Sequence, residues 1–299
     1  MPRSLSMAQA IRQTLAEAME RDPTTLVIGE SVGRSGGVAG STAGLLDQFG
    51  PERVRDLPIA DRGAVGLGVG LALAGATVVI ELSGPGRLLA CLEVLADAAH
   101  TAETTEFPVP VVLRVPAGRE AGAAIDRATA GVLGGIPGLA VACASDSGTA
   151  AGLLASALRR RGPTVLFEPR SLYTRRSGVG GDVALDKARV LATGDHVTLA
   201  AWGNGVHAAL AAASSLTAEG ISADVVDVVS LAPIDAATLG ERVRHTGRLV
   251  VVGDDDVPVE RALLAAAIHQ AFWYLESPLA AASGGADAVA RAARNAIAT

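Results

Sequence analysis

Apolar positions recur at helical spacing over residues 6–21, and a short run rich in β-branched residues follows at 24–28. This alternation of a helical pattern with a short apolar run continues along the chain. It predicts further strands at 77–80, 109–115, 138–143, 164–168, 196–201, 223–229 and 248–252. The intervening patterns predict helices at 64–75, 85–106, 148–161, 206–219, 236–245 and 259–274. Strands that alternate with helices are typical of an α/β fold, a mainly parallel sheet with helices on both faces.

The regular pattern is interrupted at three places. Residues 116–135 show no clear period, and we expect a functional loop there. Glycine, serine and arginine break the pattern again at 176–188, where we place a linker between two domains. The tail at 280–299 is rich in alanine and ends abruptly. The resulting domains are residues 1–175 and residues 189–299.

Composition indicates a globular protein with buried cores. Hydrophobic residues make up 49% of the 299 residues but aromatic residues only 3%, so alanine, valine and leucine must fill the cores. The net charge is −6, and no basic patch stands out apart from residues 159–161, so nothing favours a nucleic-acid partner. Cys91 and Cys143 show neither metal-ligand spacing nor a disulfide framework, which fits a reducing compartment.

No pattern predicts export or membrane insertion. The first residues lead directly into an amphipathic pattern, which is not typical of a signal peptide. The charge-free run at 64–80 contains four glycines and becomes β-branched after Gly75, so we interpret it as helix, turn and strand. We therefore expect a soluble, cytoplasmic protein without a membrane partner.

One carboxylate stands at the start of a glycine-dense helix. Residues 57–63 form a short segment around Asp61, and the small-residue pattern of 64–75 follows. The positive end of the helix dipole then faces this carboxylate. Asp61 is either a helix N-cap, where Asp is a preferred residue, or a carboxylate that holds a polar ring.

A glycine pattern in the second domain has two interpretations. Gly203, Gly205 and Ala208 match G-x-G-x-x-A. Asp224 and Asp227 follow at about the interval of a dinucleotide-binding fingerprint. The alternative is a tight turn between a strand and a helix, which we favour because short glycine patterns often occur without a nucleotide.

Metal binding and hydrolytic chemistry find less support. The five histidines are scattered without metal-ligand spacing, and no serine or cysteine stands in a nucleophile elbow. The three aspartates at 254–256 are more typical of a solvated turn than of a cation site. We therefore predict no metal ligands in this chain.

The order and spacing of eight segments carry a family resemblance. They are residues 10–22, 27–32, 55–61, 66–75, 109–116, 136–139, 162–168 and 230–235. From about residue 7 to residue 287, the chain resembles the β subunit of the thiamine diphosphate-dependent first component of 2-oxo acid dehydrogenase complexes. It is similar in the same way to the C-terminal half of transketolase. No single segment is specific, but their combination is.

This resemblance implies a pyrimidine-binding domain followed by a smaller transketolase C-terminal-like domain. It implies that thiamine diphosphate lies between two chains. A homologous α subunit would hold the diphosphate and Mg²⁺ through a Gly-Asp-Gly motif, which this chain lacks, in an α2β2 heterotetramer. The implied activity is that of a transferase or oxidoreductase. Such an enzyme forms an enamine from a 2-oxo acid or ketose and passes an acyl or two-carbon unit to an acceptor, such as a carrier-bound thiol.

The resemblance also assigns roles to two carboxylates. Asp61 stands where the family has a Glu that binds the aminopyrimidine and activates the cofactor, so we expect Asp61 to be catalytic and cofactor-binding. The missing methylene withdraws its carboxylate by roughly 1.5 Å. Glu30 matches an acidic residue after the first strand, where carboxylates line a channel between paired cofactors, so we expect Glu30 to be cofactor-binding as well.

Two departures from the family pattern concern the substrate. The aromatic shelf beneath the pyrimidine aligns with residues 83–87, which contain no aromatic residue, and the active-site His falls near Asp126 and Arg127. We expect Arg127 to be a catalytic residue and Arg87 a cofactor-side residue, both in contact with an anionic substrate. The alternative for each is a surface or interdomain ion pair.

Three functions remain open at this point. The first is a β-type subunit with a changed substrate, active only with its partner chain. The second is a non-catalytic scaffold subunit that stabilises an α partner. The third is an NAD-binding oxidoreductase that uses Gly203 and Gly205.

Overall fold

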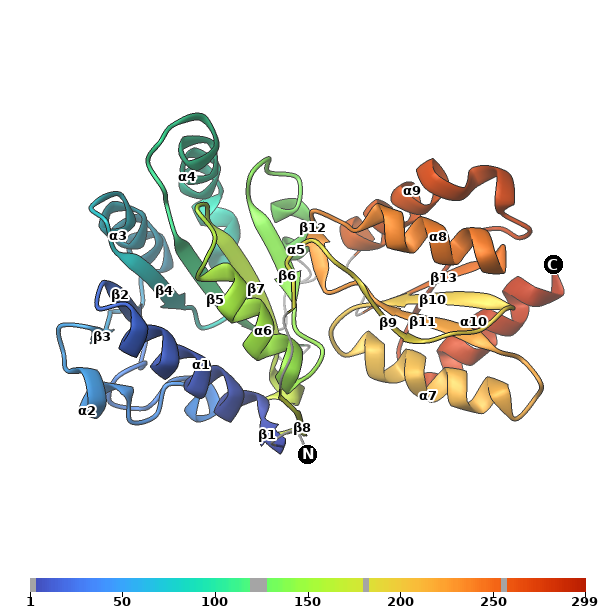
Figure 1. Cartoon of the computed structure of the whole chain (residues 1–299), viewed down its shortest axis with the longest axis horizontal. Coiled ribbons are helices and arrows are strands. Elements are labelled where there is room, and N and C mark those ends of the chain that lie inside the picture. Colours follow the sequence, from blue (N-terminus) through green and yellow to red (C-terminus); the bar gives the residue numbers. More distant parts are fainter. Residues whose placement is uncertain (1–3, 119–127, 180–182, 254–256) are drawn as a thin grey trace. The chain divides into compact units, whose positions relative to one another are not determined.

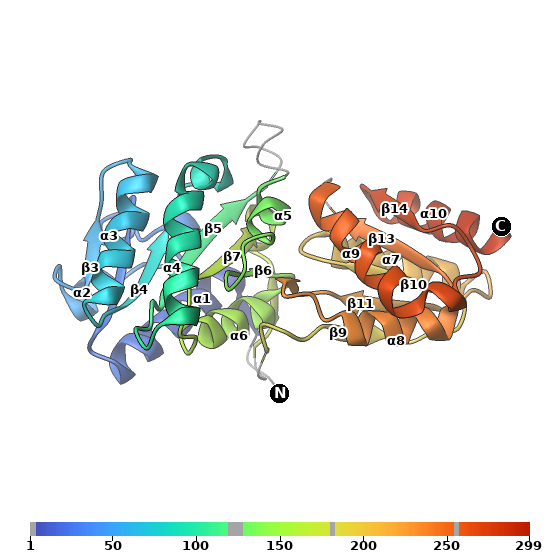
Figure 2. The same ribbon diagram turned by 90° about the horizontal axis from the view of Figure 1, so that it is seen from above.

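The chain divides into two compact α/β units. The computed structural model describes residues 4–118, 128–179, 183–253 and 257–299. Unit 1 is Met1–Leu185 and unit 2 is Asp186–Thr299. Each unit has a mainly parallel sheet between helices (Figure 1, Figure 2), which confirms the predicted fold class.

Unit 1 is a parallel sheet with helices on both faces. Its strands are β1 (Ser4–Ser6), β2 (Thr25–Gly29), β3 (Val54–Asp56), β4 (Thr77–Glu81), β5 (Val111–Ala117), β6 (Ala140–Cys143), β7 (Thr164–Pro169) and β8 (Arg176–Gly178). Its helices are α1 (Met7–Arg21), α2 (Leu45–Phe49), α3 (Asp61–Leu73), α4 (Leu92–Thr104), α5 (Thr129–Leu133) and α6 (Ser147–Ala157), with short 3-10 helices η1 (Val38–Gly40), η2 (Pro85–Cys91) and η5 (Arg170–Leu172). The parallel order is β6-β7-β5-β4-β2-β3. Helices α3 and α4 cover one face, and α1 and α6 cover the other (Figure 1).

Unit 2 repeats this layering on a smaller scale. Its strands are β9 (Arg189–Ala192), β10 (Val197–Ala201), β11 (Ala223–Asp227), β12 (Ser230–Ala232), β13 (Leu249–Gly253) and β14 (Ala280–Ser283). Its helices are α7 (Gly205–Thr217), α8 (Ala236–Thr246), α9 (Val257–Ala271), α10 (Ala286–Ala298) and the short η6 (Phe272–Tyr274). The sheet order is β14-β13-β10-β11-β9, and β9 is antiparallel to β11. Helices α7 and α10 pack together, as do α8 and α9.

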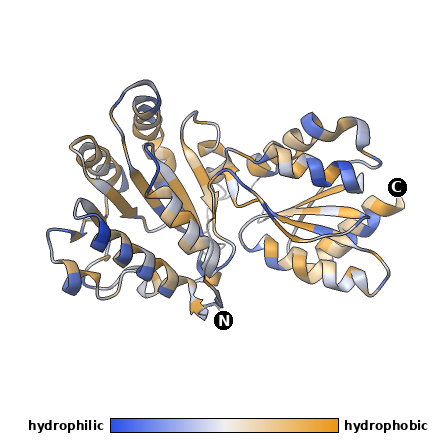
Figure 3. Cartoon of the chain, viewed as in Figure 1, coloured by the Kyte–Doolittle hydropathy of each residue, from blue (hydrophilic) through white to orange (hydrophobic). Residues whose placement is uncertain are grey.

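The cores consist of small and branched apolar side chains. The central strands of both units are hydrophobic (Figure 3), and their valine and leucine side chains are buried. Because few aromatic residues separate the layers, helices approach the sheet closely. An added Cβ at Gly68 in α3 would lie only 2.5 Å from Ile80 Cδ1 in β4. Within the described ranges, no helix is long and apolar enough to cross a membrane.

We expect Gly68→Ala to lower the free energy of unfolding by about 1–3 kcal/mol, because the new methyl group overpacks a filled core. Gly70→Ala is the matched control. Nothing lies within 4 Å of a Cβ added at Gly70, and alanine favours a helix over glycine by about 1 kcal/mol. Urea denaturation of both variants should therefore give changes of opposite sign. Equal stability of the two variants would contradict the close approach of α3 to β4.

One prediction of secondary structure is wrong in part. Only Leu92–Thr104 of the predicted helix 85–106 is α-helical, because Pro85 and its glycine neighbours begin a 3-10 segment instead. The alanine-rich tail forms β14 and α10, and α10 packs against α7. Four alanines of this tail are buried in the unit 2 core: Ala282, Ala290, Ala293 and Ala296.

Two predicted irregular segments contain short regular elements. The predicted loop 116–135 includes α5, while residues 119–127 lie outside the described part of the chain. The segment 176–188 contains β8, which pairs with β1.

Candidate active site

Two carboxylates meet at the carboxyl edge of the unit 1 sheet. Glu30 directly follows β2, and Asp61 begins α3 shortly after β3 ends. The amide of Leu57 donates to the Gly29 carbonyl oxygen at 2.7 Å, so the two chain segments stay side by side beyond their strands. The side chains of Glu30 and Asp61 lie close enough for the charge of Asp61 to raise the pKa of Glu30. The fold therefore brings together two of the residues that the sequence singled out.

Asp61 is a buried carboxylate without a full set of partners. The residue is 4% exposed, and its Oδ2 atom has no hydrogen-bond partner among the described residues. The N-cap of α3 is Ala60, and no side chain caps this helix. The interpretation of Asp61 as a helix cap is therefore wrong. A buried acceptor without a donor is rare in folded proteins and fits a site that receives an N–H or O–H group from a ligand.

Glu30 is chemically coupled to Asp61. Its Oε1 atom is also buried without a partner in the described part of the chain. Burial raises the pKa of Glu30, the charge of Asp61 raises it further, and the charge of Arg87 lowers it. The hydrogen bond to Asp61 adds to the upward shift. Burial and the neighbouring carboxylate of Asp61 therefore both disfavour the charged form of Glu30.

We expect the stability of the chain to fall as the pH rises through the raised pKa of Glu30. Unfolded Glu30 releases its proton at the ordinary carboxyl pKa, whereas the folded chain keeps it to higher pH. The stabilisation is therefore complete below the ordinary pKa and is lost as the pH rises through the raised one. Urea denaturation across this pH window should show the loss in the wild type and not in Glu30→Gln. Parallel curves for the two proteins would contradict the coupling.

Arg87 and Cys91 lie in the segment η2, and each interacts by charge with one of the two carboxylates. Arg87 is exposed in η2, and its charge acts on Glu30. Cys91 at the end of η2 is buried, and burial followed by the charge of Asp61 raises the pKa of its thiol to about 11. The thiol is therefore neutral at physiological pH and is no nucleophile. Asp126 and Arg127 lie outside the described residues.

A buried ion-pair cluster beside the carboxylates was missed in the sequence. Arg114 in β5 is completely buried. Its Nε and one terminal nitrogen donate to the two Glu168 oxygens at 2.8 Å each, and the other terminal nitrogen donates to Glu81 Oε2 at 2.8 Å. The hydroxyl of Tyr173 also donates to Glu168. The cluster therefore joins the carboxyl ends of β4, β5 and β7.

The charge states of this cluster follow from its contacts. Burial lowers the pKa of Arg114, but Glu168 and Glu81 raise it by more, so the guanidinium stays charged. Burial and the charge of Glu168 raise the pKa of Tyr173, so the hydroxyl keeps its proton. The sequence signal for this cluster is a single charged residue at or near the end of each apolar strand run.

The glycine pattern of unit 2 has a packing role. A Cβ at Gly205 would lie 2.6 Å from a carbonyl oxygen of β13, so a side chain does not fit there. Asp224 accepts from Arg242 through both carboxylate oxygens, at 2.8 and 2.9 Å. Asp227 pairs with Arg189 at 3.4 Å. Both aspartates are completely buried with these partners, so they give no support to a dinucleotide site.

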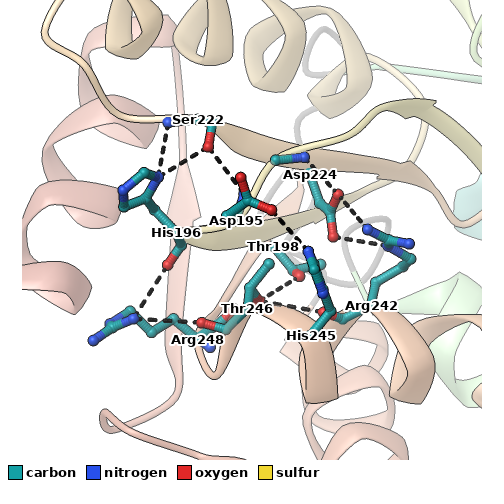
Figure 4. Close-up of polar contacts among 10 residues, drawn as sticks. Asp195, His196, Thr198, Ser222, Asp224, Arg242, His245, Thr246 and Arg248 are labelled. Atoms are coloured by element: carbon teal, nitrogen blue, oxygen red, sulfur yellow. Dashed lines mark hydrogen bonds and ion pairs between the residues drawn. The ribbon is translucent and has the colours of Figure 1, made fainter.

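A second polar cluster lies where β10 and β11 begin (Figure 4). Ser222 Oγ accepts from the Asp195 amide at 2.9 Å and lies 2.9 Å from His196 Nδ1. A different histidine, His245, contacts Asp195 through Nε2 at 2.9 Å. Because no single imidazole bridges the serine and the aspartate, this cluster is not a nucleophilic triad. It ties the amino ends of the strands, opposite the edge where sites of open α/β sheets lie.

No metal site appears among the described residues. They contain no group of three or more His, Cys, Asp or Glu side chains arranged to hold a metal ion. The aspartates at 254–256 lie outside the described ranges.

Comparison with known proteins accounts for both units. Residues 3–176 match the family described as "Transketolase, pyrimidine binding domain". Residues 186–297 match "Transketolase, C-terminal domain". A split-gene transketolase, described as an inactive beta4 tetramer, superimposes with a TM-score of 0.78 at 22% identity and covers 98% of each chain.

Two curated relatives are similar over most of the chain. One is the pyruvate dehydrogenase E1 component subunit beta-4, chloroplastic, of Oryza sativa subsp. japonica, which is 34% identical over 91% of this chain and 70% of its own. The other is the 2-oxoisovalerate dehydrogenase subunit beta of Bacillus subtilis, 34% identical over 84% of this chain and 80% of its own. These matches confirm the resemblance predicted from the eight segments. The chain belongs to the family of thiamine diphosphate-dependent 2-oxo acid dehydrogenase E1 β subunits, which is built from the transketolase pyrimidine-binding and C-terminal domains.

Proposed function

We propose that this chain supplies the pyrimidine-facing half of a thiamine diphosphate site, with Asp61 as the residue that binds the ring and activates the cofactor. The observation that supports this most is the buried Oδ2 atom of Asp61, which lacks a donor among the described residues. A nitrogen-rich ring offers such a donor. Glu30 fits the same site, because its carboxyl group lies beside Asp61 and its pKa is raised by burial and by the charge of Asp61.

The residues of this chain would act by charge and proton placement. When bound, thiamine diphosphate supplies a nucleophilic carbon that attacks the carbonyl group of a 2-oxo acid or ketose. Asp61 would present its carboxylate to the ring from a buried position, where electrostatic effects are strong. The carboxyl group of Glu30, whose pKa is raised, lies next to it. Arg87 and Arg127 are the proposed contacts for the anionic group of the substrate, whose acyl or two-carbon unit passes to an acceptor.

We propose that an α subunit completes this site in an α2β2 assembly, and that its Gly-Asp-Gly motif holds the diphosphate and Mg²⁺. This chain has no Gly-Asp-Gly sequence. The α3 helix, which begins at Asp61, presents Leu67 and Leu73 to solvent, 46% and 49% exposed. A Cβ at Gly66 or Gly70 on this helix would meet nothing within 4 Å. An exposed apolar helix face beside the half-site supports contact with another chain.

Calorimetric titration of thiamine diphosphate with Mg²⁺ tests this proposal. The titrant is added to the full chain alone and to the chain co-purified with its α-like partner. We expect tight binding only in the pair, and loss of that binding in Asp61→Ala. Absence of binding in both samples would favour the alternative, a scaffold subunit that stabilises an α partner without catalysis. Saturable NADH binding by the chain would favour an oxidoreductase.

We also propose that the protein acts in the cytoplasm. The names of its relatives include chloroplastic and mitochondrial forms, so location varies within the family. Fractionation of cells that express the tagged full-length protein tests this proposal, and recovery from another compartment would contradict it.

A further inference from the structure

The loop that follows Glu30 is built around one buried carboxylate, that of Glu81. The amide of Val38 donates to Glu81 Oε1 at 2.9 Å, and the hydroxyl of Ser41 donates to Glu81 Oε2 at 2.7 Å. Gly37 has a φ of +71°, and a Cβ there would lie 2.8 Å from Glu81 Oε1. Only glycine fits this position, so the sequence of the loop is adapted to the carboxylate that it surrounds.

Backbone contacts hold the chain on both sides of Glu30. On one side, a Cβ at Gly29 would lie 2.4 Å from the Glu81 carbonyl oxygen, so β2 lies directly against the end of β4. On the other side, Ser31 has a φ of +72°, which is unusual for a residue with a side chain. Its carbonyl oxygen accepts from the Gly37 amide at 2.9 Å. Such a backbone persists only when its surroundings hold it in place.

Arg114 makes this arrangement possible. Glu81 is 3% exposed, and an isolated carboxylate at that depth is strongly disfavoured. The completely buried guanidinium of Arg114 compensates its charge at 2.8 Å. Hydrogen bonds to a charged acceptor are roughly twice as strong as neutral ones, so a charged Glu81 holds the loop more firmly than a neutral group of the same shape.

We propose that Glu81, kept charged by Arg114, is a positioning residue that holds Glu30 beside Asp61 through the loop of residues 31–42. This inference deepens the proposed function, because it explains how the carboxyl pair is kept in place. The positioning role of Glu81 is tested on the free chain, without cofactor or partner. If the chain failed to bind cofactor, the positioning role would not be contradicted. If Glu81 did not position Glu30, the cofactor proposal would not be contradicted either.

The test compares two loop variants with a matched control. Ser41→Ala removes one hydrogen bond to Glu81 and keeps every charge, whereas Glu81→Gln removes the charge itself. Ser147→Ala is the control, because Ser147 is similarly buried and its hydroxyl also donates within the core, to the carbonyl oxygens of Leu5 and Arg175 at 2.9 and 3.3 Å. The first readout is the rate of tryptic cleavage after the exposed Arg34 in this loop, identified by mass spectrometry.

The second readout is the pKa of Glu30, followed by ¹³C NMR of carboxyl-labelled glutamate and assigned by comparison with Glu30→Gln. If Glu81 only stabilised the fold, the loop variants would leave the pKa of Glu30 unchanged. Because Ser41→Ala leaves Glu81 charged, a change in that variant reports position rather than the loss of a neighbouring charge.

We expect both loop variants to be cleaved after Arg34 at least about tenfold faster than the wild type, because cleavage follows the population of the open loop. The pKa of Glu30 should fall toward its ordinary value as the side chain leaves Asp61. Ser147→Ala should change neither readout. An unchanged cleavage rate and an unchanged pKa of Glu30 in folded Ser41→Ala would overturn the proposal. If Glu81→Gln does not fold, the result for Ser41→Ala is sufficient to test it.

Discussion

The Arg114→Met variant should lose about 3–5 kcal/mol of unfolding free energy, because it leaves two buried carboxylates without their cation. Glu81 and Glu168 are 3% and 2% exposed, and Arg114 contacts both at 2.8 Å. Methionine fills a similar volume, so the effect measures lost charge compensation rather than an empty space. Chemical denaturation followed by circular dichroism gives the difference. The matched control is Arg294→Met, which removes an exposed pair with Glu219 and should change stability little.

A second variant separates charge from packing in this cluster. Arg114→Met combined with Glu81→Gln and Glu168→Gln removes the whole set of charges. We expect this variant to be more stable than Arg114→Met alone, because no unpaired charge remains buried. If Arg114→Met and Arg294→Met lost the same stability, the buried cluster would have no special role in the fold.

The elements around the candidate site were predictable because their patterns are local. Apolar residues at helical spacing predict α1, and β-branched runs predict β2 and β4. Once Glu30 and Asp61 are placed after neighbouring parallel strands, their meeting at one edge follows from topology. The proposed cofactor role of that edge came from the family resemblance. The patterns around single residues did not indicate it.

The remaining features depend on contacts between distant residues. Arg114 meets Glu168 and Glu81 across 54 and 33 residues of sequence, and no local period marks such pairs. The alanine-rich tail becomes a strand and a helix only because α7 and β13 provide a surface for them. The exclusion of Asp61 as a helix cap likewise required the backbone of Ala60.

The other large effect concerns catalysis. In a reconstituted pair with the α-like subunit, Asp61→Asn should lower turnover about 10²–10⁴-fold on whichever 2-oxo acid or ketose the wild-type pair uses. Asparagine keeps the size of the side chain but removes the negative charge that we propose activates the cofactor. Assembly should persist, because Asp61 makes no cap contact that the helix needs. The measurements are steady-state turnover and the mass of the complex.

Asp146→Asn is the matched control for this experiment. It makes the same chemical change at the N-cap of α6, where Asp146 accepts from the Thr149 amide at 2.6 Å and asparagine caps equally well. We expect near wild-type turnover and an intact pair. Wild-type turnover in Asp61→Asn would remove the catalytic role of this carboxylate and leave the scaffold interpretation. Loss of turnover with an intact complex, together with unchanged turnover in Asp146→Asn, would place the chemistry at the buried Asp61 oxygen that has no donor among the described residues.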